Sequence, residues 1–70
     1  MNVNEQEQNK MKSHARARAN QVRGVVSSLI IQRAEQASEE YVSQNGFEGE
    51  DKENRKQEYI ETFKEFTNLA

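Results

Sequence analysis

The side chains best suited to chemistry by type and spacing lie within residues 10–23, and the chemistry they suit is phosphate contact. The set consists of Lys10, Lys12, Arg16, Arg18, Asn20 and Arg23. On a helix these residues form two rows that flank a stripe of small apolar residues. Small residues let a helix approach nucleic acid closely, lysine and arginine reach backbone oxygens, and an asparagine can read a base edge. The pattern makes residues 10–23 a candidate nucleic-acid-binding arm.

The charge distribution supports a second interpretation of this arm, which is contact with an acidic protein surface. Residues 1–23 carry a net charge of +3 and residues 24–70 a net charge of −5, which together give −2 for the chain. The isoelectric point of about 5.4 is low for a dedicated DNA-binding domain. Basic residues that border an apolar face are also typical of bundle helices. In that case they pair with acidic side chains of another subunit, either within Glu48–Glu53 or at Glu35, Glu39 and Glu40.

Catalysis and metal binding find little support in the sequence. The chain contains no cysteine and a single histidine, His14, so neither a thiolate site nor a pair of imidazoles can form. It also contains no glycine-rich phosphate-binding loop. Glutamates spaced along a helix are typical of a solvated face, and we expect His14 to be solvated or structural. We therefore predict that the protein is not an enzyme and uses no metal, cofactor or small-molecule substrate.

The spacing of apolar residues predicts two helices separated by one tight turn. The chain has no proline, and its strongest turn signal is an Asn-Gly pair within residues 45–49. Before this turn, apolar residues recur every three or four positions from Met11 to Tyr41, which predicts a long helix over about residues 4–44. After the turn, aromatic residues at the same spacing predict a second helix over residues 50–69.

Gly24 leaves open an alternative in which residues 1–70 form three helices. A glycine in the middle of a helix costs stability, so Gly24 can break the long helix in two. The run that follows it, residues 25–31, is also compatible with a strand. A lone strand has no second strand to pair with in this sequence, however. We therefore favour an all-α fold, an antiparallel helical hairpin in a single domain.

The apolar residues of the first helix predict self-association. Val25 and Ile31 lie well off the stripe that the other apolar residues follow, so the helix is apolar on more than one face. One short second helix cannot cover several faces, whereas a second subunit can. In a hairpin the basic arm also extends beyond the end of the second helix. We predict a homodimer in a four-helix arrangement, with a self-association core of Val22, Val26, Leu29, Ile30, Tyr59, Phe63 and Phe66.

The function that these features favour is a small, non-enzymatic protein-interaction module. It would act as an adaptor, inhibitor or regulator of a larger protein, as small phage and plasmid proteins do. The alternative is a helical nucleic-acid-binding dimer that uses the arm at residues 10–23. The longest apolar runs are far shorter than the ~20 residues that cross a bilayer, and the N-terminus lacks the apolar segment of a signal peptide. We therefore expect a cytoplasmic protein without membrane contact.

Overall fold

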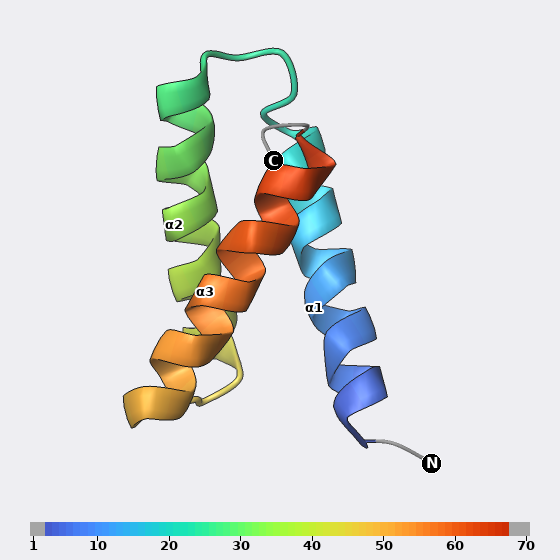
Figure 1. Ribbon diagram of the computed structural model, residues 1–70, viewed down its shortest axis with the longest axis vertical. Coiled ribbons are helices and arrows are strands. Elements are labelled where there is room, and N and C mark those ends of the chain that lie inside the picture. Colours follow the sequence, from blue (N-terminus) through green and yellow to red (C-terminus); the bar gives the residue numbers. More distant parts are fainter. Residues whose placement is uncertain (1–2, 68–70) are drawn as a thin grey trace.

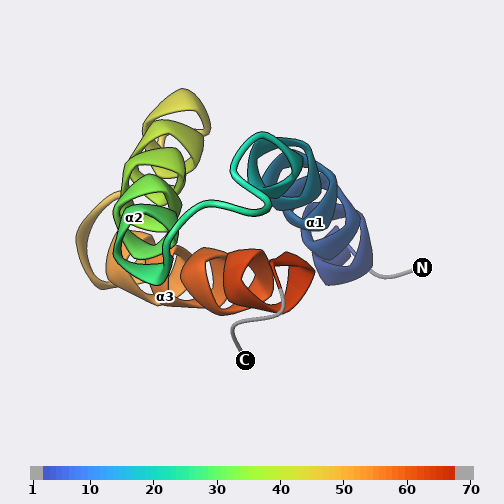
Figure 2. The ribbon, with the colours of Figure 1, turned by 90° about the horizontal axis from the view of Figure 1, so that it is seen from above.

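The computed structural model describes residues 3–67, which form three α-helices joined by two loops (Figure 1). They are α1 (Val3–Asn20), α2 (Ser27–Gln44) and α3 (Gly49–Phe66). α1 and α2 run in opposite directions, and α3 lies across both on one side of the pair (Figure 2). The prediction of an all-α protein is confirmed. Within residues 3–67, no helix combines the length and the apolar character that crossing a bilayer requires.

The predicted two-helix hairpin is wrong, because the first helix ends at Asn20 and a second one begins at Ser27. Gly24 adopts a φ of +90°, which residues with a side chain disfavour and which lies outside the helical region. Val26 then takes an extended backbone, with φ −67° and ψ 150°, as the N-cap of α2. The chain therefore adopts the three-helix alternative, and the predicted four-helix arrangement of two hairpins is not confirmed.

The break after α1 also changes where the basic arm lies. α1 folds back along α2 and packs on α3, so the arm does not project beyond the end of a hairpin (Figure 1). Its apolar stripe of Met11, Ala15 and Ala19 is buried against the other two helices. A third helix thus covers part of the apolar surface for which the sequence predicted a second subunit.

The turn between α2 and α3 is built on Asn45 and Gly46. The side-chain amide of Asn45 donates a hydrogen bond to the backbone oxygen of Tyr41 over 2.8 Å. Gly46 adopts a φ of +71°, the left-handed conformation that often follows the end of a helix. α3 ends at Phe66, and residues 68 and 69, which close the predicted second helix, lie outside the described part of the chain.

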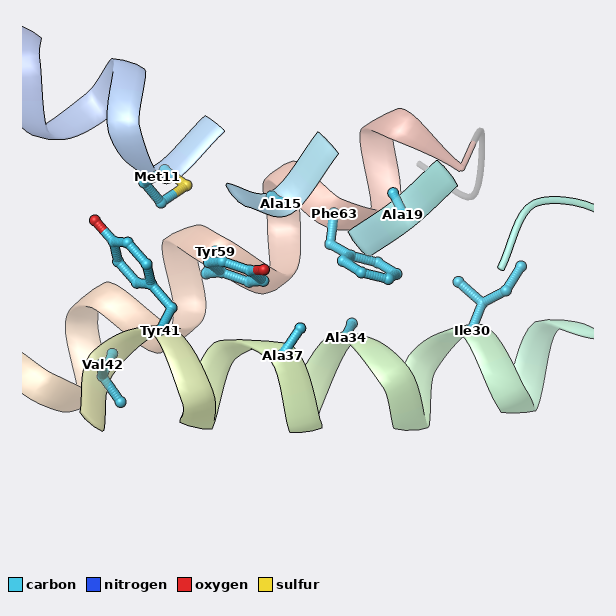
Figure 3. Close-up of a cluster of buried hydrophobic side chains, with 10 residues drawn as sticks. All are labelled: Met11, Ala15, Ala19, Ile30, Ala34, Ala37, Tyr41, Val42, Tyr59 and Phe63. Atoms are coloured by element: carbon cyan, nitrogen blue, oxygen red, sulfur yellow. The ribbon is translucent and has the colours of Figure 1, made fainter. Parts of the chain in front are cut away.

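The core forms where aromatic rings of α3 fit against alanines of α1 and α2 (Figure 3). Tyr59 and Phe63 are both fully buried, and the Phe63 ring lies between Ala19 of α1 and Ala34 of α2. Alanine side chains are small, so the two flanking helices can approach the rings closely. The other buried apolar residues are Met11, Ala15, Ile30, Ala37, Tyr41 and Val42.

Candidate functional site

The six residues of the candidate arm fall into two groups. Lys10 and Arg18 turn toward the rest of the bundle. Lys10 Nζ donates to Asn45 Oδ1 over 2.9 Å, and Arg18 forms an ion pair with Glu40 on α2. That ion pair lies within one chain, whereas the sequence suggested pairing across subunits. The other four are exposed along α1 and the loop that follows it, and they are Lys12, Arg16, Asn20 and Arg23.

A polar cluster of His14, Glu40 and Tyr59 joins the three helices beside Arg18. The Tyr59 hydroxyl lies 2.5 Å from His14 Nδ1, and His14 Nε2 lies 3.5 Å from Glu40 Oε1. An ionised carboxylate can only accept a hydrogen bond. The geometry therefore fits a neutral imidazole that holds its proton on Nε2, toward Glu40, and accepts a hydrogen bond from Tyr59 on Nδ1.

Burial governs the ionisation of this cluster. Burial lowers the pKa of His14 below its usual 6.5, the charge of Arg18 lowers the pKa further, and Glu40 opposes both effects. Burial also raises the pKa of the Tyr59 hydroxyl, so this group remains a protonated donor. Each member of the cluster is engaged by another member or by Arg18, and this arrangement favours a structural role.

Sequence reasoning missed the polar cluster, although one signal for it was present. His14 lies three residues after Met11 and one before Ala15, so it borders the apolar stripe of α1. A histidine at such an edge lies close to neighbouring helices in a bundle. Its partner Tyr59 is 45 positions away in sequence, and the pairing of the two depends on the three-helix topology.

The predicted self-association core is divided between the interior and the surface of one chain. Ile30, Tyr59 and Phe63 are buried inside the chain, where they pack against the other helices. Val22 and Phe66 are half-buried at the margin of that core. Val26 and Leu29 are exposed. The exposed members of the predicted self-association core, Val26 and Leu29, therefore lie at the end of the bundle that holds the α1–α2 loop.

An apolar patch occupies this end of the bundle, and we define it as Val25, Val26, Leu29 and Ile31. Their exposed fractions are 41%, 63%, 43% and 42%. All four belong to the α1–α2 loop or to the first turns of α2, so they are close neighbours in the chain (Figure 1). Val25, Val26 and Leu29 gather where the loop enters α2, whereas Ile31 follows Leu29 by two residues and so lies on another face of the helix. Clustered exposed apolar residues mark interaction sites, whereas single exposed apolar residues are ordinary.

A groove opens between α1 and α2 next to the apolar patch, with a volume of about 310 Å³. We call it the arginine groove, and its lining includes Arg18, Gln21, Val22, Arg33, Gln36 and the buried Phe63. Arg18 is paired with Glu40, which also lines the groove. Arg33 Nη1 donates to Gln36 Oε1 over 3.4 Å, and no ion pair to Arg33 forms among residues 3–67. The groove therefore presents the Arg33 guanidinium, which can pair with an anionic group of a ligand.

A second groove of about 290 Å³ lies near the start of α1 and of α3. Its arginine, Arg55, is already neutralised by Glu7 at 3.2 Å and by Asp51 at 3.1 Å. The guanidinium of Arg55 also stacks on Phe47, with 4.0 Å between Cζ and the ring centroid. These contacts hold Arg55 in the fold, so the second groove presents no comparable free cation.

No protein-family model, no curated protein and no solved structure matches this chain. Within residues 3–67, no group of three or more histidine, aspartate or glutamate side chains is placed to hold a metal ion. The apolar patch and the arginine groove are the surface features from which a function can be argued.

Proposed function

We propose that the protein is a small interaction module that docks on a larger protein through the apolar patch, as an adaptor, inhibitor or regulator. The observation that carries this proposal is that Val25, Val26, Leu29 and Ile31 remain between 41% and 63% exposed in an otherwise well-packed bundle. Covering apolar surface is worth about 25 cal/mol per Å². A partner that covers these side chains gains that free energy on binding.

The homodimer remains a prediction within this proposal. Val26 and Leu29 are the members of the predicted self-association core that one chain leaves exposed, and a second copy is one possible occupant of the patch. Sedimentation equilibrium at micromolar concentrations tests it. A dimer that dissociates on Leu29→Asp supports self-association through the patch, and a monomer at all concentrations contradicts it.

The alternative function, binding of nucleic acid, is favoured by one observation. Lys12, Arg16, Asn20 and Arg23 are all exposed, and the first three follow one another at i, i+4 and i+8 along α1. Arg18, however, is paired with Glu40, and the chain carries a net charge of −2, which weakens its attraction to a phosphate backbone. We therefore expect negligible binding to duplex or single-stranded DNA and RNA at physiological salt.

A comparative capture experiment tests the proposal. Wild-type protein, Leu29→Asp and Lys12→Ala/Arg16→Ala are each immobilised and exposed to a lysate of the cells that make the protein, after nuclease treatment. We expect proteins that the wild type and Lys12→Ala/Arg16→Ala retain equally and that Leu29→Asp loses. Equal retention by all three variants contradicts the proposal. Loss of ligands on nuclease treatment or with Lys12→Ala/Arg16→Ala, together with binding that falls steeply with salt, supports nucleic acid instead.

A further inference from the structure

The apolar patch and the arginine groove form one continuous surface. Leu29 of the patch and Arg33 and Gln36 of the groove lie at i, i+4 and i+7, so they share one stripe of α2. On the other side of the groove, Val22 precedes Val25 of the patch by three residues. A single ligand that covers Leu29 can therefore extend along α2 into the groove.

The charges beside this surface are predominantly positive. Arg18 and Arg33 line the groove, Arg23 is exposed in the adjoining loop, and Glu40 is the acidic residue of the groove lining. Glu40 is taken up by Arg18. The side chains near the loop thus carry excess positive charge on a chain whose net charge is −2. A bound segment that places a carboxylate opposite Arg33 accepts hydrogen bonds from the remaining N–H donors of its guanidinium.

We propose that this continuous surface binds an amphipathic helix of a partner protein in which an aspartate or glutamate stands beside the apolar stripe. The apolar side chains of that helix cover Val26 and Leu29, and its carboxylate enters the groove and pairs with Arg33. The inference rests on the proposed function, since it names the chemistry of the partner that docks at the same patch. Helix-in-groove binding with one charged anchor is a recurrent mode of protein recognition.

Charge favours another protein over a second copy as the occupant of the patch and groove together, and a dimer that buries both would contradict this inference. A two-fold dimer places the same surface on both sides of the interface, so Arg33 would meet a surface of the same positive charge. Glu40, the acidic residue of the groove lining, is already paired with Arg18. Like charges that meet across an interface cost free energy. An acidic segment from another protein brings the opposite charge.

Shape and composition argue against nucleic acid and lipid as occupants of this surface. A phosphate backbone supplies an anion for Arg33 but no apolar side chain for Val26 and Leu29. A bilayer surface supplies both, but segments that insert into it usually carry tryptophan, phenylalanine or leucine in larger number, and a flat surface does not enter a groove of about 310 Å³. A side chain that projects from a helix can enter the groove.

The test selects ligands from a display library of randomised helical peptides on the immobilised full-length protein. We expect the enriched peptides to combine leucine, isoleucine or phenylalanine at helical spacing with an adjacent aspartate or glutamate. Fluorescence anisotropy of a selected peptide then measures its affinity for wild type, Leu29→Asp, Arg33→Glu and Arg16→Glu. Arg16→Glu is the matched control, because it makes the same charge change on the exposed face of α1.

We expect Arg33→Glu to weaken peptide binding by about tenfold or more, and Arg16→Glu to change it less than twofold. Exchange of the peptide carboxylate for lysine is expected to restore binding to Arg33→Glu. Enrichment of peptides without acidic residues, equal affinity for Arg33→Glu, absence of any enriched peptide, or binding of anionic vesicles in place of peptides overturns the inference. Selected peptides that depend on Leu29 but not on Arg33 leave the proposed function intact, whereas peptides that depend on neither contradict both.

Discussion

Tyr59 places a hydroxyl inside a small core and His14 places an imidazole at its margin, and a buried polar group without a partner costs about 1–3 kcal/mol. Each finds its partner on another helix, since Tyr59 of α3 contacts His14 of α1, and His14 faces Glu40 of α2. No buried side-chain nitrogen or oxygen lacks a hydrogen-bond partner in the described part of the chain. The polar cluster therefore contributes to the alignment of the three helices, which alanine packing alone specifies weakly.

The lowered pKa of His14 makes stability depend on pH. The unfolded chain binds a proton near the usual pKa of 6.5, whereas the folded chain binds it at a lower pH. Stability is therefore fully present above about pH 6.5 and is lost as the pH falls toward the folded pKa, with a slope below the one-proton limit of about 1.4 kcal/mol per pH unit. Arg18, Glu40, Tyr41 and Tyr59 are the charged or titratable groups that face His14.

Urea denaturation of wild type and His14→Gln between about pH 7.5 and pH 5.5 measures this effect. His14 is the single histidine of the chain, so we expect the pH slope in this window to shrink or vanish in His14→Gln. A proton NMR titration of the imidazole, in which the folded pKa falls below 6.5, provides an independent reading. An unchanged slope in His14→Gln, or an imidazole pKa above 6.5, contradicts the linkage.

At the scale of the helices, the first predicted helix shows what a pattern of apolar residues can determine. The spacing of three and four continues from Met11 through Val22 and Val26 to Tyr41, so periodicity alone predicts one helix. The chain departs from it at Gly24, where a positive φ lets α1 fold back onto α3. Helix type was predictable because it is local. The topology was not, because it depends on packing between segments far apart in sequence.

The same distinction applies to the candidate site. The off-stripe positions of Val25 and Ile31 indicated apolar residues that the partner helix does not cover, and both are exposed. The roles of Lys10 and Arg18 could not be predicted, because their partners Asn45 and Glu40 are 35 and 22 positions away. Exposure follows from the pattern within one helix, whereas pairing requires the arrangement of all three.

Gly24→Ala tests the loop that makes three helices out of two. A Cβ at this position meets no atom within 4 Å, so the effect comes from the backbone, whose φ of +90° residues with a side chain disfavour. We expect a loss of about 1–2 kcal/mol in the free energy of unfolding, read as a lower urea midpoint at an unchanged m-value. A synthetic chain with D-alanine at the same position accepts a positive φ and is expected to be at least as stable as wild type. Equal destabilisation by both alanines contradicts this account.

At the scale of the whole molecule, α3 joins the other two helices. It contributes the fully buried rings of Tyr59 and Phe63, which pack against alanines of α1 and α2 and against Tyr41 of α2 (Figure 3). Ion pairs reinforce this role at the surface, where Lys56 of α3 binds Glu39 of α2 at 3.0 Å and Arg55 binds Glu7 of α1 at 3.2 Å. Exposed pairs of this kind are each worth at most about 1 kcal/mol. Burial of apolar side chains between the helices, the α3 rings among them, therefore stabilises the bundle more than these ion pairs do.

Phe63→Ala tests whether the bundle unfolds as one unit. The side chain is fully buried, and replacement of such a phenylalanine by alanine costs about 3–5 kcal/mol. A domain of 70 residues has a total stability of about 4–10 kcal/mol, so this loss removes a large part of it. Because α1 and α2 contact each other less than either contacts α3, we expect them not to retain a hairpin once α3 leaves. We expect the circular dichroism signal at 222 nm to fall over the whole helical content.

Phe66→Ala is the matched control for this experiment, because it makes the same change on the same helix at a half-buried position near its end. Less apolar surface is lost there and solvent can fill the space, so we expect a cost of about 1–2 kcal/mol and a bundle that stays folded. Loss of only the signal that corresponds to α3 in Phe63→Ala would show that α1 and α2 form a stable hairpin without it. That outcome would overturn the central position of α3, and with it the claim that the alanine faces depend on the rings between them.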